Sequence, residues 1–331
     1  MTIIYQEDDG DLGYLTGKTI GIIGYGNLGR PLALNLRDSG IRPIIGVRDA
    51  ERGAQARADG LRTGDIDAIT KESDIIMMMI PDEAMPQVYL DHVAPSLKRG
   101  DMLVFSSGYN IAFGFIEVPP FVDVGLIAPR TLGASVRERY LDERGFYSFV
   151  SVGQDVSGIA WPTLLALAKA VGALKAGAVE VSIEQEAELD LFIQQAILPM
   201  LHLVITTAAN LLLNLGYPPE AAFLDLYISG ELRDYLDKAG EDGLMSALRL
   251  SSLTGQYGVL SRLARFKDLK LERLMEMTLE EIRNGEFSKE WSKEYADGYR
   301  RLQNLLKEQE QLDIWEMEQQ TLDMLKGRLF F

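Results

Sequence analysis

Three glycines near the start of the chain have the spacing that is needed to hold a phosphate group. They follow residues 20–23, an isoleucine-rich run typical of a strand buried on both faces. In order, Gly24 permits a tight turn, Gly26 lets a pyrophosphate approach the backbone, and Gly29 lets helix and strand pack closely. A helical pattern follows, so the pyrophosphate would lie at a helix N-terminus. The stretch predicts a dinucleotide site, and the alternative is a tight turn that binds nothing.

Two arginines follow the next predicted strand, at 43–47. In such folds the residues after this strand face the adenosine ribose, where an acid selects the 2′-hydroxyl and an arginine accommodates a 2′-phosphate. Arg48 comes first here and Arg52 follows, with Asp49 and Glu51 between them. We therefore expect NADPH, with NADH as the alternative. The simpler interpretation of the segment is a solvated, charged loop.

Three further predicted strands each end in a polar turn. Residues 81–83 read PDE, residues 106–110 read SSGYN and residues 128–133 read APRTLG. The carboxyl ends of neighbouring strands in an open parallel sheet line one crevice, where ligands bind. We therefore expect these turns to meet at the ligand.

Strand-like patterns stop at about Ser182, and helical periodicity continues to the end of the chain. The sequence therefore predicts two domains, an α/β Rossmann domain with a parallel sheet at 1–181 and an all-helical domain at 182–331. Glu186, Asp190 and Gln194 have the i, i+4, i+8 spacing that places side chains on one helix face. That face is either a site or a solvated surface.

The overall composition excludes several classes of function. The 331 residues carry a net charge of −16 with a pI near 4.7, which argues against nucleic-acid binding. Cysteine is absent, so disulfides and thiolate chemistry are excluded. Residues 197–215 are apolar but interrupted by polar side chains, which favours a buried helix or a dimer interface over a membrane span. We expect a soluble, cytoplasmic protein with no membrane partner.

Motifs along nearly the whole chain resemble the ketol-acid reductoisomerases, in their shorter form. The matching stretches are GYGNLG with ALNLRDSG, LKRGDMLVFSSGYNI at 97–111, VDVGLIAP at 122–129, ELDLFIQQAIL at 188–198, SSLTGQYG at 251–258 and IRNGEFSKEW at 282–291. The resemblance implies a helical domain that intertwines with a second subunit, in a homodimer or a higher homo-oligomer. It also implies NADPH and two Mg²⁺ ions acting on 2-acetolactate in branched-chain amino-acid biosynthesis. An alkyl migration would come first, and hydride reduction of the resulting 2-keto acid would follow.

The chain departs from this family where the metal ions would bind. The family's bridging aspartate is retained as Asp190, but the glutamate four residues later is Gln194. Of two further glutamates, one is retained as Glu231 and the other is Tyr227. Two of four anionic ligands are thus missing, and amide oxygens are weaker ligands for Mg²⁺ than carboxylates. Asp190 and Glu231 remain as metal candidates, and Glu186 is a nearby acid that would partly restore the site.

The family's other reactive positions also differ. Its histidine is replaced by Ser107 and its lysine by Arg130, while a substrate-contacting serine is retained as Ser252. An arginine is no proton donor at neutral pH, but it binds carboxylates through two N–H groups. The expected catalytic residues are Asp190, Ser107, Arg130, Gln194, Glu231 and Ser252. The expected cofactor contacts are Gly24, Tyr25, Gly26, Asn27, Leu28, Gly29, Arg48, Arg52, Pro81, Asp82, Ser107 and Gly133.

These departures predict an NAD(P)H-dependent oxidoreductase that reduces a small 2-keto acid, carbonyl or imine without the isomerase step. Alkyl migration depends on the two-metal centre, whereas hydride transfer needs only one cation or a general acid. The alternatives are a Mg²⁺-dependent ketol-acid reductoisomerase and a non-catalytic nucleotide-binding protein.

Overall fold

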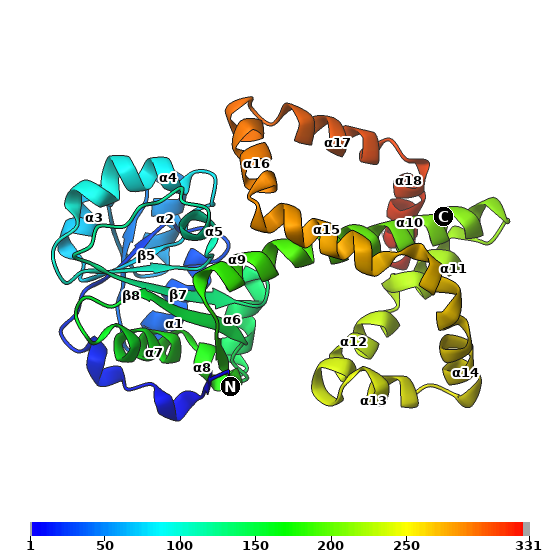
Figure 1. Cartoon of the computed structure of the whole chain (residues 1–331), viewed down its shortest axis with the longest axis horizontal. Coiled ribbons are helices and arrows are strands. Elements are labelled where there is room, and N and C mark those ends of the chain that lie inside the picture. The colour runs from blue at the N-terminus through cyan, green and yellow to red at the C-terminus, as the bar shows by residue number, and fades with distance from the viewer. Residues whose placement is uncertain (1, 327–331) are drawn as a thin grey trace. The chain divides into compact units, whose positions relative to one another are not determined.

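The computed structural model describes residues 2–326, except for the side chain of residue 268, and forms two compact units that divide between Asp190 and Leu191 (Figure 1). The division lies inside helix α9, Ile183–Phe192, and not before it. Ile183 and Glu186 are both buried, and Ile183 belongs to the core of the first unit. The start of this helix therefore folds with the Rossmann unit, later in the chain than the boundary expected at 181/182.

A nine-stranded sheet forms the centre of the first unit, in the order β1-β9-β8-β7-β6-β5-β2-β3-β4. The strands are β1 Ile4–Tyr5, β2 Ile20–Ile23, β3 Ile44–Gly46, β4 Arg62–Gly64, β5 Ile75–Met78, β6 Met102–Phe105, β7 Asp123–Pro129, β8 Ser148–Gln154 and β9 Ala178–Glu180. The expected parallel arrangement holds from β4 to β7. Beyond β7 lie strands that the sequence does not predict, and two of their pairings are antiparallel: β8 with β7 and β1 with β9. The sheet is therefore mixed, and the parallel part contains all five strands that the sequence predicts.

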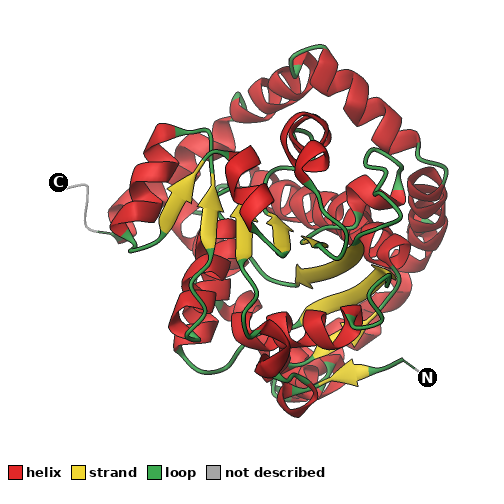
Figure 2. Ribbon diagram, turned by 90° about the vertical axis from the view of Figure 1, so that its left-hand side faces the viewer, coloured by secondary structure: helices red, strands yellow, loops and turns green. Residues whose placement is uncertain are grey.

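Helices cover both faces of this sheet (Figure 2). They are α1 Gly29–Asp38, α2 Ala50–Ala58, α3 Ile66–Glu72, α4 Met85–Val88, α5 Tyr109–Ala112, α6 Gly133–Leu141, α7 Ala160–Val171, α8 Ala173–Ala176 and the start of α9, with short 3₁₀ or π turns at η1 Glu7–Asp9, η2 Leu12–Leu15, η3 Tyr89–Val93 and η4 Ala94–Ser96. One core joins apolar residues of α1, α6 and α7 to the sheet, and a second core lies under α3, α4 and α9. Burial on both faces explains why the central strands are almost wholly apolar.

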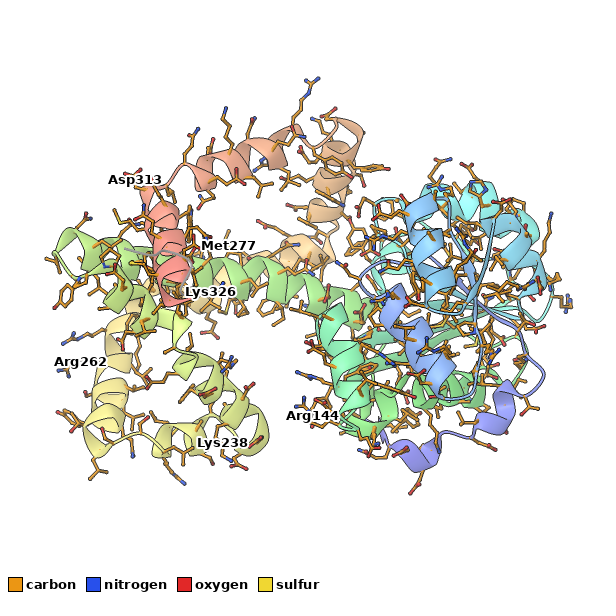
Figure 3. The ribbon with its side chains drawn as sticks, turned by 180° about the vertical axis from the view of Figure 1, so that it is seen from behind. Arg144, Lys238, Arg262, Met277, Asp313 and Lys326 are labelled. Atoms are coloured by element: carbon orange, nitrogen blue, oxygen red, sulfur yellow. The ribbon has the colours of Figure 1, made fainter. Side chains whose placement is uncertain are left out.

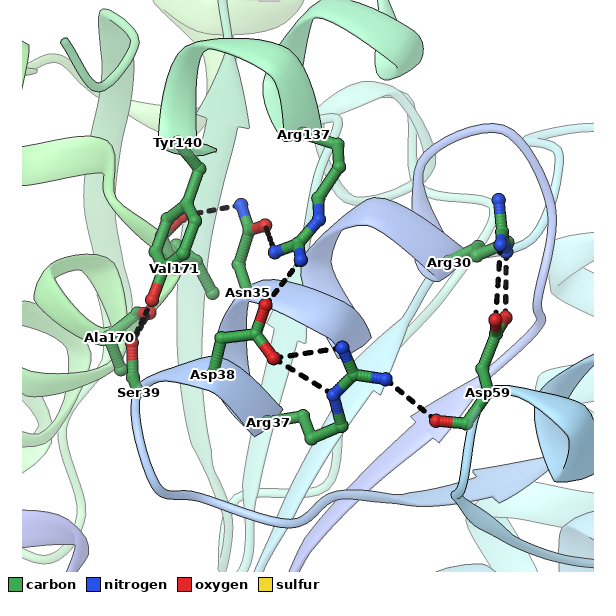
Figure 4. Close-up of polar contacts among 10 residues, drawn as sticks. All are labelled: Arg30, Asn35, Arg37, Asp38, Ser39, Asp59, Arg137, Tyr140, Ala170 and Val171. Carbon is green, nitrogen blue, oxygen red and sulfur yellow. Dashed lines mark hydrogen bonds and ion pairs between the residues drawn. The ribbon is translucent and has the colours of Figure 1, made fainter. Parts of the chain in front are cut away.

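The C-terminal half of α1 is fixed by a polar network (Figure 4). Buried Asn35 donates to the Val171 carbonyl at 2.9 Å and accepts from Arg137 at 2.9 Å. The Arg137 guanidinium also pairs with Asp38. Because these contacts hold α1 against α6 and α7, the glycine turn at the other end of α1 has a rigid support.

The second unit is entirely helical. Its elements are η5 Ile193–Ile197, α10 Leu198–Asn214, α11 Pro219–Phe223, η6 Leu224–Ile228, α12 Glu231–Asp242, α13 Leu244–Arg249, α14 Leu253–Arg262, η7 Leu263–Leu269, α15 Leu271–Arg283, α16 Glu286–Ala296, α17 Arg300–Glu310 and α18 Asp313–Leu325. Among its described residues, one small buried cluster is built on Ala209, Phe223 and Ile314. Many large apolar side chains are exposed instead, among them Met277 of α15, which is labelled in Figure 3.

One helix among the described residues, Ile183–Asn214, is long and apolar enough to cross a membrane by length and composition alone. It comprises α9, η5 and α10, and only 11% of its most apolar window is buried within the chain. Helices that pack against another protein chain can be equally long and apolar.

Candidate cofactor and substrate site

The three glycines of the turn are required for different reasons. Gly24 has a φ of +102°, and a Cβ there would lie 2.5 Å from the Met79 carbonyl oxygen. A Cβ on Gly29, the first residue of α1, would lie 2.3 Å from the Gly24 carbonyl oxygen. A Cβ on Gly26 would meet no heavy atom within 4 Å. The fold itself requires glycine at 24 and 29, whereas the space over Gly26 is open for a ligand.

A cavity of about 570 Å³ lies beside this turn. It is lined by Gly24, Tyr25, Gly26, Gly46, Val47, Arg48, Asp49, Arg52, Ile66, Met79, Ile80, Pro81 and Val88. The Asp49 side chain caps α2 by accepting from the Arg52 backbone N–H at 2.8 Å. Both Arg48 and Arg52 are exposed, and neither forms an ion pair with any residue in the described part of the chain. The structure thus places both predicted arginines at the glycine turn, with their guanidinium groups available to an anion.

Two predicted cofactor contacts, Tyr25 and Gly133, shape the turn. The Tyr25 side chain is buried, and its hydroxyl donates to Asp59 at 2.8 Å, away from solvent. A Cβ on Gly133, at the start of α6, would lie 2.1 Å from the Asn27 carbonyl oxygen. The glycine at 133 therefore lets α6 approach the turn at Asn27 and Leu28.

The turns after β5 and β6 meet through Asp82. The Ser107 hydroxyl donates to one Asp82 carboxylate oxygen at 3.3 Å. The Asn110 side-chain amide donates to the other oxygen at 3.2 Å and to the Asp82 carbonyl at 3.1 Å. As predicted, the polar turns after neighbouring parallel strands lie together at one edge of the sheet.

The end of β7 meets α9 through Arg130. Its Nη1 donates to Glu186 Oε1 at 2.9 Å, and its Nη2 pairs with Asp190 Oδ1. The other Glu186 oxygen accepts from the Gly108 backbone N–H at 2.6 Å. The Arg130 guanidinium also lies over the Phe149 ring, 5.0 Å from its centroid. One N–H of each terminal nitrogen of Arg130 binds a carboxylate of this chain, so the fork is not open to a two-point contact with a substrate carboxylate, although each terminal nitrogen keeps a second N–H.

Two carboxyl groups in this cluster hold a proton more strongly than usual. The pKa of Glu186, which is 1% exposed, is raised to about 7, chiefly by burial and also by the Asp190 charge, against the opposing effects of the Gly108 hydrogen bond and the Arg130 charge. Burial likewise raises the pKa of Asp82 to about 6, while the Ser107 hydrogen bond lowers it. Both groups therefore titrate near neutral pH, as expected of proton donors in a reaction site.

The remaining predicted residues lie in the helical unit. Gln194 lies in the π-helical segment η5, Glu231 is the first residue of α12, and the Ser252 hydroxyl caps α14 by accepting from the Gly255 N–H at 3.1 Å. The Tyr227 hydroxyl hydrogen-bonds to Glu318 of α18. All of these residues lie in the helical unit, and their role in catalysis stays a prediction.

The carboxylates at this site are already paired within the chain. Among residues 2–326, no group of three or more acidic or histidine side chains is placed to hold a metal ion. Asp190 is paired with a guanidinium, and both oxygens of Glu186 accept hydrogen bonds. Mg²⁺ is usually held by one or two carboxylates together with waters in octahedral geometry. In this arrangement Arg130 occupies the two carboxylates that would hold such an ion.

Sequence reasoning missed the contributions of Gly108 and Asn110. A Cβ on Gly108 would lie 2.4 Å from the Ile183 carbonyl oxygen and 3.0 Å from Glu186, so this glycine allows α9 to reach the end of β6. Both residues belong to the SSGYN turn after β6, and the sequence marks Gly108 only as one more glycine in a turn at a strand end.

The first unit has a Rossmann sheet with a glycine turn and an adjacent cavity, and carboxyl groups of raised pKa lie at its strand ends. These features together define a nicotinamide-nucleotide-dependent oxidoreductase. Residues 14–177 match the family described as acetohydroxy acid isomeroreductase, NADPH-binding domain, and residues 183–326 match the ketol-acid reductoisomerase C-terminal domain. The chain belongs to the ketol-acid reductoisomerase family.

Relatives match over nearly the whole chain. The ketol-acid reductoisomerase (NADP(+)) of Pyrobaculum calidifontis is 38% identical, over 92% of this chain and 93% of its own length. The enzyme of the same name from Methanopyrus kandleri is 38% identical, over 98% of this chain and 99% of its own. The solved structure of an NADH-preferring ketol-acid reductoisomerase from an uncultured archaeon aligns with a TM-score of 0.89 at 31% identity, covering 96% of this chain and 98% of that one. The resemblance identified in the sequence is confirmed, as is a fold with a Rossmann and a helical part.

Proposed function

We propose that this protein is an NAD(P)H-dependent reductase of a small 2-keto acid, carbonyl or imine that does not perform the isomerase step. The observation that carries the proposal is the polar cluster of Asp82, Ser107, Arg130, Glu186 and Asp190 at the strand ends. Bound NAD(P)H supplies a hydride. Addition of hydride to a carbonyl carbon places negative charge on the oxygen, which then requires a cation or a proton.

This chain provides both kinds of group. Arg130 supplies the positive charge, and Asp82 and Glu186 are carboxyls whose pKa values of about 6 and about 7 let them hold a proton near neutral pH. Gly26 leaves room for the cofactor pyrophosphate, and Arg48 and Arg52 supply positive charge for its 2′-phosphate.

A Mg²⁺-dependent ketol-acid reductoisomerase is the second candidate, and a specific observation favours it. Relatives that carry this name are 36–39% identical over nearly all of their length. Their names support this candidate better than they support a different reductase. Against it stand the replacements at Ser107, Arg130, Gln194 and Tyr227, which remove groups that the two-metal reaction requires.

One assay separates the two candidates. NADPH oxidation is followed with 2-acetolactate and, separately, with the rearranged 2-keto acid, each with saturating Mg²⁺ and with EDTA. Reduction of the 2-keto acid alone, unaffected by EDTA, is the expected result. Mg²⁺-dependent turnover of 2-acetolactate would establish the isomerase step and refute our proposal. Cofactor binding with no turnover across a broad panel of keto acids, carbonyls and imines would instead indicate a non-catalytic nucleotide-binding protein.

We also propose that the helical unit joins two copies of the chain. Support comes from α10, where Leu201, Leu203, Val204 and Leu211 are between 42% and 64% exposed. Apolar side chains this exposed favour burial against another chain. A cytoplasmic location and the absence of a membrane partner stay predictions.

A further inference from the structure

Arg130 lies between two carboxylates that are one helical turn apart on α9. We propose that its guanidinium is the resident cation of this site and takes the place of a divalent metal ion between Asp190 and Glu186. The inference deepens the proposed reductase function and rests on it for the identity of the reaction. Its test, however, measures cation binding and needs no substrate.

The contacts of Arg130 use both branches of its planar fork. Nη1 donates to Glu186 and Nη2 pairs with Asp190, so each carboxylate has its own nitrogen. Residues at i and i+4 of a helix lie on the same face, so their carboxylates can converge on the two nitrogens of one guanidinium fork. A lysine ammonium is a single point charge on a flexible stem and lacks this two-branched geometry. The substitution of arginine at 130 is therefore matched to two acids on α9.

The position of the guanidinium is further fixed by residues around the start of the neighbouring strand, β8. The Arg130 backbone N–H donates to the Tyr147 carbonyl at 2.8 Å, and Phe149 two residues later packs under the guanidinium. The Arg130 side chain is 27% exposed and Glu186 only 1%. An ion pair that is largely shielded from water is weakly screened by salt, so the cluster persists at physiological ionic strength.

A divalent ion and this guanidinium exclude each other. An ion bound by Asp190 and Glu186 would lie against a permanent positive charge, because arginine stays protonated at every physiological pH. Because Glu186 Oε2 already accepts from the Gly108 N–H, an ion would bind Glu186 through Oε1, the oxygen that Arg130 Nη1 occupies. The guanidinium N–H groups instead provide the electrophilic assistance that a carbonyl oxygen needs during reduction.

The proposal is tested by Mn²⁺ binding, measured by electron paramagnetic resonance on the full-length protein with NADP⁺ present. We expect no tight Mn²⁺ binding by the wild type. Arg130→Gln removes the positive charge from between the two carboxylates, and we expect it to bind Mn²⁺ at least about tenfold more tightly than the wild type. Adding Asp190→Asn to Arg130→Gln should abolish the gain, which locates the new ion.

Arg137→Gln is the matched control, since Arg137 likewise pairs with an acid and a second acceptor, Asp38 and Asn35, in the network of Figure 4. It should leave Mn²⁺ binding unchanged. Tight, stoichiometric Mn²⁺ binding by the wild type that Arg130→Gln does not strengthen would overturn the proposal. If Arg130→Gln does not fold, the wild-type titration alone decides, with tight binding against the proposal and its absence for it. A missing substrate would affect only the proposed reaction and not this measurement.

Discussion

Replacing Gly26 and Gly29 separately by alanine should uncouple cofactor binding from folding. Gly26 has open space where the new methyl group would lie and is not among the glycines with positive φ. The folded state therefore tolerates Gly26→Ala, and the reduced entropy of the unfolded chain should raise stability by about 0.4–1 kcal/mol. At Gly29 the methyl group would lie 2.3 Å from the Gly24 carbonyl oxygen. The turn must then move, at a cost of ~1–3 kcal/mol typical of overpacking.

Gly26→Ala, the variant expected to keep its stability, is the one expected to lose affinity for the cofactor. The methyl group at 26 occupies the space through which a pyrophosphate reaches the backbone N–H groups of the turn. Loss of a hydrogen bond to a charged group costs ~1.5–3 kcal/mol. NADPH binding by Gly26→Ala should therefore weaken by a factor of roughly 10 to 100.

Two measurements check this pair of variants. Thermal unfolding without cofactor should rank Gly26→Ala at or above the wild type and Gly29→Ala below it, and calorimetric titration with NADPH should show the loss of affinity at 26. Wild-type affinity in Gly26→Ala would refute the assignment of this space to the cofactor. A stability loss at 26 as large as at 29 would refute the steric argument.

Three further predictions concern charge and association. Arg48→Ala should weaken NADPH far more than NADH in parallel titrations, because the exposed guanidinium at the cavity would contact only the 2′-phosphate, and equal weakening would contradict that assignment. Between pH 4.5 and about 7 the folded wild type keeps a Glu186 proton that the unfolded chain has lost, so its stability falls as pH rises through this window. Glu186→Gln has no titrating group at this position and so lacks this pH dependence. Denaturant titrations at pH 5 and pH 8 should show the free energy of unfolding of the variant rising relative to that of the wild type by at most ~3 kcal/mol. No change between the two pH values would rule out a raised Glu186 pKa. Leu203→Glu on α10 should lower the molar mass measured by light scattering, and an unchanged mass would exclude that surface from an interface.

The sequence predicts β2, β3, β5, β6 and β7 well because those strands are buried and read as continuous apolar runs. It misses the other four strands: β1, β4 and β9 have only two or three residues, β4 is partly exposed, and β8 varies in burial and carries polar residues. The helical unit was predicted from periodicity, but the i, i+4, i+8 reading at 186, 190 and 194 assumes an uninterrupted α-helix. A π-helical segment begins at Ile193, and its wider turn changes the direction of Gln194 relative to Asp190.

At the site, the residue types could be predicted from the sequence, but their contacts could not. Ser107, Arg130 and Asp190 are identified from strand ends and from the resemblance. The structure pairs Ser107 with Asp82 and Arg130 with Glu186, and the backbone N–H of Gly108, next to Ser107, also binds Glu186. The partners of Arg130 were not predictable, because they depend on α9 beginning inside the Rossmann unit. That position depends on Gly108, which a sequence pattern alone does not distinguish from an ordinary turn glycine.

A positive charge on a side chain is always present at the site, whereas a metal ion must bind from solution. Because Arg130 is tethered beside Asp190 and Glu186, its effective concentration there is set by the fold and does not change with dilution or chelators. An enzyme built on this arrangement would keep its cation when free magnesium falls. It would also lose the opportunity to be regulated by magnesium, so control of its flux would have to act through the nucleotide or through the amount of protein.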